Sequence, residues 1–259
     1  MRKQRKRADG LQSLARGLDV LRLLADSACT VDELGRALGM PRSTAYRTLV
    51  ALRDRHLVER DPRGPRYTLG YGILRLARAL LGRVPVREIA LPTMRELAAS
   101  VEETAVLTVR DGRYGVAIES IEASGPVRVA PAPGERVPLH VGAPMKALLA
   151  FLPADEIEAY VKRPLERPTA RAIAEPGKLR AHLAQIRRRG YAESWEEVYP
   201  GAVGVAVPIL DPDGVPVASL AVAGPVHRFT PERVAAVAQR LMPAAKELGR
   251  RIQNVREER

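Results

Sequence analysis

The chain has 259 residues, of which 46% are apolar and 28% charged, so it can form two globular domains and is not a low-complexity polymer. No apolar run approaches the length of a membrane span, and the basic N-terminus lacks the apolar stretch of a signal peptide, so we expect no membrane partner. The single cysteine, Cys29, excludes an internal disulfide and suits the reducing cytoplasm.

The positive charge is concentrated at one end of the chain. Residues 1–83 hold 18 Lys and Arg against 8 Asp and Glu, whereas residues 84–259 hold 24 against 22. Almost all of the net charge of +12 therefore lies in the first third of the sequence. A polyanionic partner that binds this end is the simplest explanation.

The first predicted segment is a basic arm over residues 1–12. Five of its first seven residues are basic and it shows no hydrophobic periodicity, so we expect it to be flexible. Such an arm either follows the phosphates of DNA or only aids solubility, and both interpretations stay open. Leucines recurring at three- and four-residue intervals then predict a helix over residues 13–25.

Residues 30–55 have the pattern of two short helices around a glycine turn. Thr30 and Glu33 are spaced as a capping box that begins the first helix, and Gly39 ends it. Pro41 suits the first turn of the second helix. The inward stripe of that helix is Ala45, Leu49 and Leu52.

The outward face of the second helix is rich in hydrogen-bond donors. In a helix-turn-helix, the N-terminal half of this helix contacts base edges in the major groove. Arginine can donate two bonds to guanine, and serine or threonine can bond a base or a phosphate. The outward residues of that half are Arg42, Ser43, Thr44, Tyr46 and Arg47. The alternative is an ordinary helical hairpin with a solvated face.

A small basic hairpin is predicted next. Residues 57–61 and 66–70 are strand-like runs separated by Pro and Gly turn residues. The turn carries Arg63 and Arg66 to the tip, where they are placed to contact phosphates or the minor groove. This wing favours a winged helix-turn-helix over residues 13–69. The expected partner of such a domain is double-stranded DNA.

The rest of the chain predicts a linker and a second domain. Residues 70–84 favour a linker helix that also has surface for a second copy, and Val84-Pro85 marks the boundary. The domain over 85–255 has expected helices at 86–101, 145–152, 155–161, 178–189 and 231–253, and expected strands at 104–110, 114–122, 203–210 and 217–224. Tight turns make adjacent strands antiparallel, so we predict an α+β sheet with helices over a face, able to hold a small molecule.

No catalytic or metal site is indicated. Glu193, Glu196 and Glu197 are close enough for acid–base chemistry or a metal, but we favour a solvated loop. The histidines lack zinc-site spacing, and His140 is expected to pack beside the sheet rather than line a pocket. No phosphate loop or nucleophile motif is present. We expect no enzyme and no cofactor.

Six segments in order resemble the IclR family of bacterial transcription regulators. They are SLARGLDVLRLLA, LGMPRSTAYRTLVAL, LVERD with RYTLG, RVPLHVGAPMKALLAFLP, RRRGYAESWEEVYPGAVGVAVPILDPDG and ASLAVAGP, spread over residues 14–250. The resemblance implies an N-terminal winged helix-turn-helix, a helical linker and a C-terminal GAF-like antiparallel sheet with flanking helices. It also implies homodimers or tetramers on a palindromic operator, and a small-molecule effector from catabolism.

The effector pocket implied by the resemblance departs from the family pattern. Met145 stands where glycine is usual, Gly204 where cysteine or serine is frequent, and Ser194 where some members have aspartate. Ala221 and Ala223 stand at positions that are often serine. Because a carboxylate that leaves water needs replacement hydrogen bonds, these changes favour an apolar or aromatic effector, with loss of the ligand as the alternative.

The remaining polar chemistry of that pocket is sparse. Backbone N–H groups at the start of the helix that carries Lys146 can attract an anion. Thr104 and Ser194 are candidate side chains. The residues assigned to the effector are Thr104, Ala143, Pro144, Met145, Ser194, Gly204, Ala221 and Ala223.

The predicted function is a ligand-responsive DNA-binding regulator. As a hypothesis, Arg42, Thr44 and Tyr46 select the sequence. The phosphate contacts are assigned to Arg47, Arg63 and Arg66. The alternative is an effector-independent DNA-binding protein whose second domain serves only assembly. A small hydrolase or lyase fused to a DNA-binding head comes third.

Overall fold

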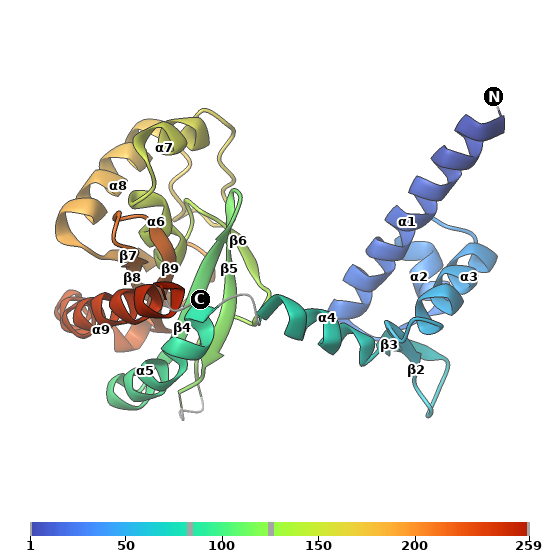
Figure 1. Cartoon of the computed structure of the whole chain (residues 1–259), viewed down its shortest axis with the longest axis horizontal. Coiled ribbons are helices and arrows are strands. Elements are labelled where there is room, and N and C mark those ends of the chain that lie inside the picture. Colours follow the sequence, from blue (N-terminus) through green and yellow to red (C-terminus); the bar gives the residue numbers. More distant parts are fainter. Residues whose placement is uncertain (1, 82–84, 124–126, 258–259) are drawn as a thin grey trace. The chain divides into compact units, whose positions relative to one another are not determined.

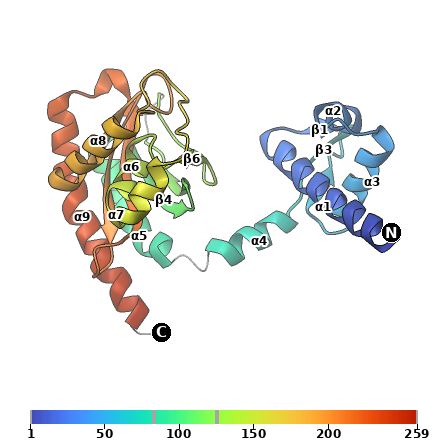
Figure 2. The same cartoon turned by 90° about the horizontal axis from the view of Figure 1, so that it is seen from above.

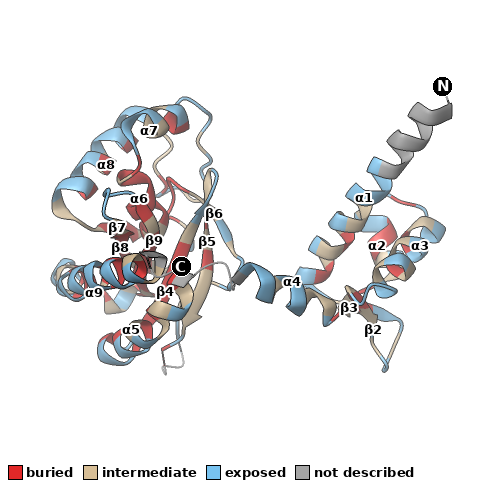
Figure 3. Cartoon of the chain, viewed as in Figure 1, coloured by how far each residue is buried: buried red, intermediate tan, exposed pale blue. Residues whose placement is uncertain are grey.

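The structure is a computed structural model that describes residues 2–81, 85–123 and 127–257. The chain forms two compact units, residues 1–83 and 84–259 (Figure 1). This division falls at the predicted Val84-Pro85 boundary, of which Val84 lies outside the described residues. Each unit has its own hydrophobic core (Figure 3).

The N-terminal unit is a winged helix-turn-helix. Its helices are α1 (Arg2–Asp26), α2 (Val31–Ala37), α3 (Arg42–Arg53) and α4 (Gly72–Leu81). Its strands are β1 (Cys29–Thr30), β2 (Val58–Arg60) and β3 (Arg66–Leu69), in the antiparallel order β1-β3-β2. The two helices around the turn and the two-stranded wing are the elements that the sequence predicts.

Local chemistry explains the turn between α2 and α3. The Glu33 N–H donates to Thr30 Oγ1 at 3.2 Å and the Thr30 N–H donates to Glu33 Oε2 at 2.8 Å, which confirms the capping box. Gly39 ends α2 with φ +59°, a conformation that glycine adopts without strain. Leu34, Ala45 and Leu49 are fully buried and fix the side of α3 that faces outward.

Three details of this unit differ from the prediction. Helix α1 begins at Arg2 rather than at Ser13, so residues 2–12 of the predicted arm are helical, while residue 1 lies outside the described residues. Pro41 is the residue before α3 and not part of its first turn. Strand β1 was not predicted, since two residues carry no alternation pattern; its partners are Tyr67 and Arg66 of β3.

The C-terminal unit is a six-stranded antiparallel sheet between helices (Figure 2). The strands are β4 (Thr104–Asp111), β5 (Tyr114–Ile121), β6 (Arg136–Pro138), β7 (Ala192–Trp195), β8 (Ala202–Leu210) and β9 (Pro216–Pro225), in the order β6-β5-β4-β9-β8-β7. The helices are α5 (Pro85–Val101), α6 (Ala143–Ala150), α7 (Ala154–Val161), α8 (Pro176–Arg189) and α9 (Pro231–Glu257), with the 3-10 turn η1 (Val226–Arg228).

Both faces of this sheet are covered, whereas the sequence analysis expected helices over one face. Helices α5 and α9 pack on one face, where Ala105 and Leu107 of β4 are buried. Helices α6, α7 and α8 pack on the other, where Val106 is buried. The alternation along β4 follows from side chains pointing to opposite faces of a strand. Figure 3 shows the buried sheet between the two helical layers.

The predicted hairpins are present, and two strands, β6 and β7, were missed. β4 pairs with β5 across Gly112, and β8 pairs with β9 across Gly214, both glycines having positive φ. β7 was not predicted because its four residues follow α8 with only Gly190 and Tyr191 between them, and β6 has only three residues. Among the described residues, no helix has both the length and the apolar character that crossing a bilayer requires.

Candidate nucleic-acid interface and ligand cavity

The outward face of α3 is exposed. Arg42, Ser43, Tyr46 and Arg47 are exposed, with Tyr46 at 50%, and Thr44 is half-buried. The buried Ala45 and Leu49 determine this orientation, because residues four apart share one face of a helix. Four of the five predicted residues therefore lie on the exposed side of α3, and Thr44 lies at its edge.

Two of the predicted arginines are engaged within the protein. Arg42 pairs with the Asp32 carboxylate of α2. Arg66 donates to the Ala28 carbonyl at 2.5 Å and to Glu33 Oε1 at 3.1 Å. Since Arg66 lies opposite Thr30 in the β1–β3 register, it ties the wing to the start of α2 instead of standing at the wing tip.

Arg63 and Arg47 are the available cations of this surface. Both are exposed, and neither side chain has a partner among the described residues. Arg63 lies in the wing turn, where its backbone N–H donates to Asp61 Oδ1 at 2.8 Å. A groove between α3 and the wing also contains Arg60, which the sequence analysis did not select. Its lining residues are Val31, Arg42, Ser43, Tyr46, Arg60, Pro65 and Tyr67.

The C-terminal unit contains a cavity between α6 and the sheet. Its walls come from β4, β5, β6 and the segment before it, the start of α6, the β7–β8 region and β9. The side chains that line it are mostly apolar: Val106, Thr108, Ala117, Val129, Pro131, Glu135, Val137, Ala143, Pro144, Met145, Ser194, Val198, Tyr199, Ala202, Val203, Val222 and Ala223, with Gly115, Gly142 and Gly204.

Six of the eight predicted effector residues line this cavity, and two lie elsewhere. The six are Ala143, Pro144, Met145, Ser194, Gly204 and Ala223. Ala221 is 1% exposed and packs in the core under α6. Thr104 is fully buried opposite Ala223, and its hydroxyl has no hydrogen-bond partner among the described residues.

Met145 occupies much of the cavity. A Cβ atom on Gly115 would come within 2.6 Å of Met145 Cγ, and one on Gly142 within 2.8 Å of Met145 Cε. The free space that remains is about 70 Å³. An apolar cavity that accepts benzene is larger, roughly 150 Å³. An aromatic ligand therefore requires Met145 to change rotamer, which its flexible unbranched side chain allows.

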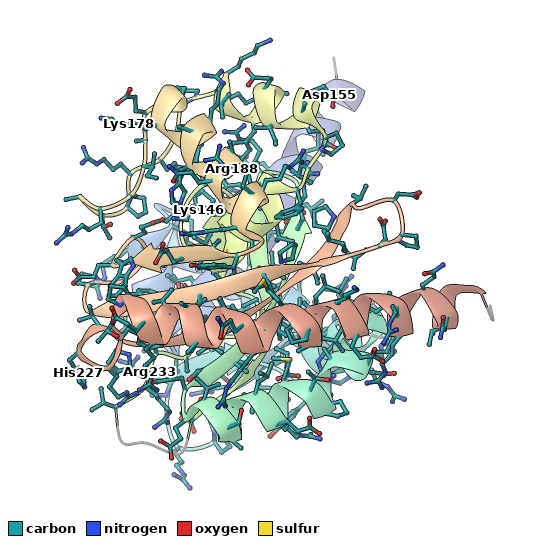
Figure 4. The ribbon with its side chains drawn as sticks, turned by 90° about the vertical axis from the view of Figure 1, so that its left-hand side faces the viewer. Lys146, Asp155, Lys178, Arg188, His227 and Arg233 are labelled. Atoms are coloured by element: carbon teal, nitrogen blue, oxygen red, sulfur yellow. The ribbon has the colours of Figure 1, made fainter. Side chains whose placement is uncertain are left out.

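A buried charged cluster supports the wall of the cavity. The fully buried Lys146 lies on the α8 side of the sheet, away from α9 (Figure 4), where its Nζ pairs with Glu197 Oε1 and lies 3.2 Å from His182 Nε2. Burial lowers the pKa of Lys146. Burial, and then the positive charge of Lys146, lower the pKa of His182 to about 4. Glu197 therefore compensates the one charge in this cluster.

Glu197 also occupies the N-terminus of α6. Its Oε2 accepts the Gly142 N–H at 2.9 Å, and Gly142 adopts φ +81° to present that group. The sequence predicts Glu197 on a solvated loop and an α6 N-terminus that is free to attract an anionic ligand. The structure corrects the first expectation, since Glu197 is 7% exposed, and shows a protein carboxylate where the second expected a ligand.

Glu193 and His140 make structural contacts. Glu193 accepts from Arg189 at 2.6 Å and from the Trp195 indole at 3.2 Å. His140 is buried, with its ring nitrogens 2.7 Å from the Tyr160 hydroxyl and from the Glu166 carbonyl, so it packs beside the sheet as predicted. Within the described ranges, no group of three His, Cys, Asp or Glu residues is arranged to hold a metal ion.

Comparison with known families agrees with both units. Residues 13–62 match the IclR helix-turn-helix domain, and residues 78–250 match the family described as "Bacterial transcriptional regulator IclR C-terminal". The chain belongs to the IclR family. The helix-turn-helix match lies within the first unit and the C-terminal match covers most of the second, beginning six residues before it, so this member has the DNA-binding and C-terminal parts of an IclR regulator.

Relatives extend the IclR match over nearly the whole chain. It is 33% identical to the HTH-type transcriptional regulator KipR of Bacillus subtilis, over 86% of this chain and 89% of KipR. The Thermotoga maritima IclR crystal structure has a TM-score of 0.79 and 30% identity, covering 93% of this chain and 98% of that one. An IclR homologue from Microbacterium hydrocarbonoxydans, complexed with 4-hydroxybenzoate, has a TM-score of 0.78 and 26% identity, covering 92% and 99%. The curated relatives are named as transcriptional regulators and not as enzymes.

Proposed function

We propose that this IclR-family protein is a ligand-responsive transcription regulator that binds a palindromic operator as a homodimer or tetramer and senses a small apolar or aromatic molecule. The observation that carries the proposal is the pairing of two features in one chain. The N-terminal unit presents exposed arginines on α3 and the wing, and the C-terminal unit encloses an apolar cavity. The cytoplasm is the expected location, because DNA is the partner.

The DNA contacts are assigned by position and by pairing. Thr44 and Tyr46, on the outward face of α3, are proposed to select the sequence, together with Arg42 once it exchanges Asp32 for a base. Arg47 and Arg63, whose side chains have no partner among the residues that the structure describes, are proposed to contact phosphates. The pairing of Arg66 with Glu33 supports a role in holding the wing, with a smaller share of the phosphate contacts.

The cavity is the proposed effector site. Its apolar walls favour an apolar or aromatic ligand, and the aromatic ligand of the Microbacterium homologue supports a small ring compound. An effector can shift operator affinity only as far as it prefers one arrangement of the protein over another. The small free space, which Met145 restricts, favours the effector-independent alternative, so ligand binding has to be tested separately.

Exposed leucines in the N-terminal unit support a homo-oligomer. On α4, Leu74, Leu76 and Leu80 are 63%, 55% and 65% exposed, and on α1, Leu14 is 62% exposed. Apolar surface of this kind marks a protein contact. A second copy is the fitting partner, since two symmetric heads would read the two half-sites of a palindrome.

The test of DNA binding uses the DNA immediately upstream of the protein's own coding region. Affinity is titrated against salt, with a scrambled DNA of equal length as competitor. A preference of about a thousandfold and a steep salt slope are expected for a specific regulator. Equal affinity for both DNAs contradicts an operator at that position.

A ligand screen by thermal unfolding separates the proposed function from its alternative. A ligand that binds the folded protein raises the melting temperature. For the protein to be ligand-responsive, the same ligand must also change the affinity of the protein for its operator. A second domain that serves only assembly shows neither effect.

A further inference from the structure

The ligand cavity has a single side chain in its described lining that is charged at neutral pH, Glu135. This residue directly precedes strand β6 and is half-buried. The other polar side chains on the wall are uncharged: Thr108, Ser194 and Tyr199. Among the residues that the structure describes, no Lys, Arg or His lines the cavity. The only formal charge at the wall is therefore negative.

The backbone holds Glu135 firmly in place. Its carbonyl accepts the Ala117 N–H of β5 at 3.1 Å, and its own N–H donates to the Ala132 carbonyl at 2.9 Å. The neighbouring Gly134 N–H donates to the Ala117 carbonyl at 2.7 Å. The segment before β6 is thus an extension of the sheet edge, and the Glu135 side chain belongs to a preformed wall.

The nearby arginines do not neutralise Glu135. Arg136, the next residue, pairs with Asp111 at 3.0 Å. Arg128 pairs with Glu122. No salt bridge to the Glu135 carboxylate is present in the described part of the chain, and burial raises the pKa of this carboxyl. A half-buried carboxylate without a counter-charge gains from a ligand that donates a hydrogen bond or brings a positive charge.

The opposite wall is already taken in part by a protein carboxylate. The α6 N-terminus, where an anionic group would otherwise be attracted, already binds the Glu197 carboxylate through the Gly142 N–H. The positive charge of Lys146 is directed to that same carboxylate. A ligand carboxylate would therefore meet the Glu135 carboxylate and no Lys, Arg or His in the described lining, and leaving water would cost it hydration.

We infer that the cavity takes a small, largely apolar ligand whose polar end is a hydrogen-bond donor to Glu135, an amine before an alcohol, and that it rejects the corresponding carboxylate. The inference rests on the proposed function only in taking this cavity as the effector site. It narrows the ligand from apolar or aromatic compounds in general to those that carry an amino or hydroxyl group and no acid.

The test uses three probes of one size, benzylamine, benzyl alcohol and benzoate, titrated calorimetrically into the full-length protein at neutral pH. We expect benzylamine to bind most tightly, benzyl alcohol more weakly, and benzoate not at millimolar concentration. Glu135→Gln should weaken benzylamine about tenfold or more, because the charge-assisted bond is lost. The same variant should change benzyl alcohol by less than about threefold, because the glutamine carbonyl still accepts a hydrogen bond.

Glu96→Gln is the matched control. Glu96 is an exposed residue of α5, which packs on the sheet face opposite the cavity, so this variant should bind all three probes like the unchanged protein. The inference is overturned if benzoate binds as tightly as benzylamine, if Glu135→Gln and Glu96→Gln bind benzylamine equally, or if no probe binds. Operator binding, measured on the same samples, is independent of these outcomes. Loss of specific DNA binding would overturn the proposed regulator itself.

Discussion

Arg47 and Arg63 of the N-terminal unit are exposed and have no protein partner in the described ranges, whereas Lys146 of the C-terminal unit is fully buried against Glu197. An exposed arginine stays hydrated until it binds a polyanion, and that binding releases counterions from the polyanion. The exposed arginines of the N-terminal unit are therefore suited to contacts with phosphate. A cation neutralised inside the protein contributes no net charge to a ligand site. The excess positive charge of the N-terminal unit is therefore available to a partner. The cavity of the C-terminal unit, in contrast, must select its ligand by shape and by the charge of Glu135.

The largest expected effect is on the buried ion pair. Lys146→Met leaves the Glu197 carboxylate without its counter-charge, so the free energy of unfolding of the C-terminal unit should fall by about 3–5 kcal/mol. Urea unfolding followed by the fluorescence of Trp195, the single tryptophan of the chain, measures this unit. Lys178→Met is the control, since Lys178 is 74% exposed and its pair with Glu175 lies at the surface. The double variant Lys146→Met/Glu197→Gln should recover part of the lost unfolding free energy. If Lys146→Met lowers the unfolding free energy no more than Lys178→Met does, the contrast between buried and exposed cations in the two units is contradicted.

Met145→Ala tests whether the cavity is limited by shape. Removing this side chain should cost about 2 kcal/mol of unfolding free energy, at the low end for a buried methionine because the site already borders free space. Benzyl alcohol should bind about tenfold more tightly, because the ring no longer has to displace the side chain. Calorimetry measures the affinity of Met145→Ala and of a control variant for benzyl alcohol. The control is Met242→Ala on α9, where the side chain is partly exposed. Unchanged affinity would show that Met145 does not restrict the ligand.

The pH dependence of stability should report on His182. Its pKa is lowered from 6.5 to about 4 in the folded protein, so the stabilising contribution is complete above pH 6.5 and is lost as the pH falls toward 4. The groups that act on it are Lys146, Arg189 and Glu193. As the pH falls, His182→Gln should lose about 1–2 kcal/mol less unfolding free energy than the unchanged protein does. Urea unfolding at pH 7 and pH 4.5 checks it, and the exposed His227→Gln should leave the profile unchanged.

The smallest expected effect separates the two wing arginines. Arg63→Ala should weaken binding to all DNA sequences alike and reduce the salt slope by about 1. Arg66→Ala should change the slope less and instead lower the stability of the N-terminal unit by roughly 0.5–1 kcal/mol, because its pair with Glu33 is lost. Salt titrations with operator and scrambled DNA measure both. Equal slopes for the two variants, or a loss of sequence preference with Arg63→Ala, would contradict these assignments.

The elements that could be predicted are those specified by neighbours in sequence. The Thr30 and Glu33 capping box, the glycine turn at Gly39, and the Asp111-Gly112 hairpin each depend on groups a few residues apart. Helical and strand periodicity placed the other long elements for the same reason. Strand β7 and the two-residue β1 carry too few residues for a pattern.

The sequence by itself determined the winged helix-turn-helix, the antiparallel sheet and the end of the chain that carries the positive charge, because propensity, capping and composition are local or additive. Only the tertiary structure decided which charges are free. Lys146 and Glu197 are 51 positions apart, and Glu103, fully buried, pairs with Arg228 across 125 positions. Whether such a carboxylate is solvated, paired or, like Glu135, left facing a cavity depends on which distant segments pack against it. Burial sets the cost of a charge, and burial is a property of the fold.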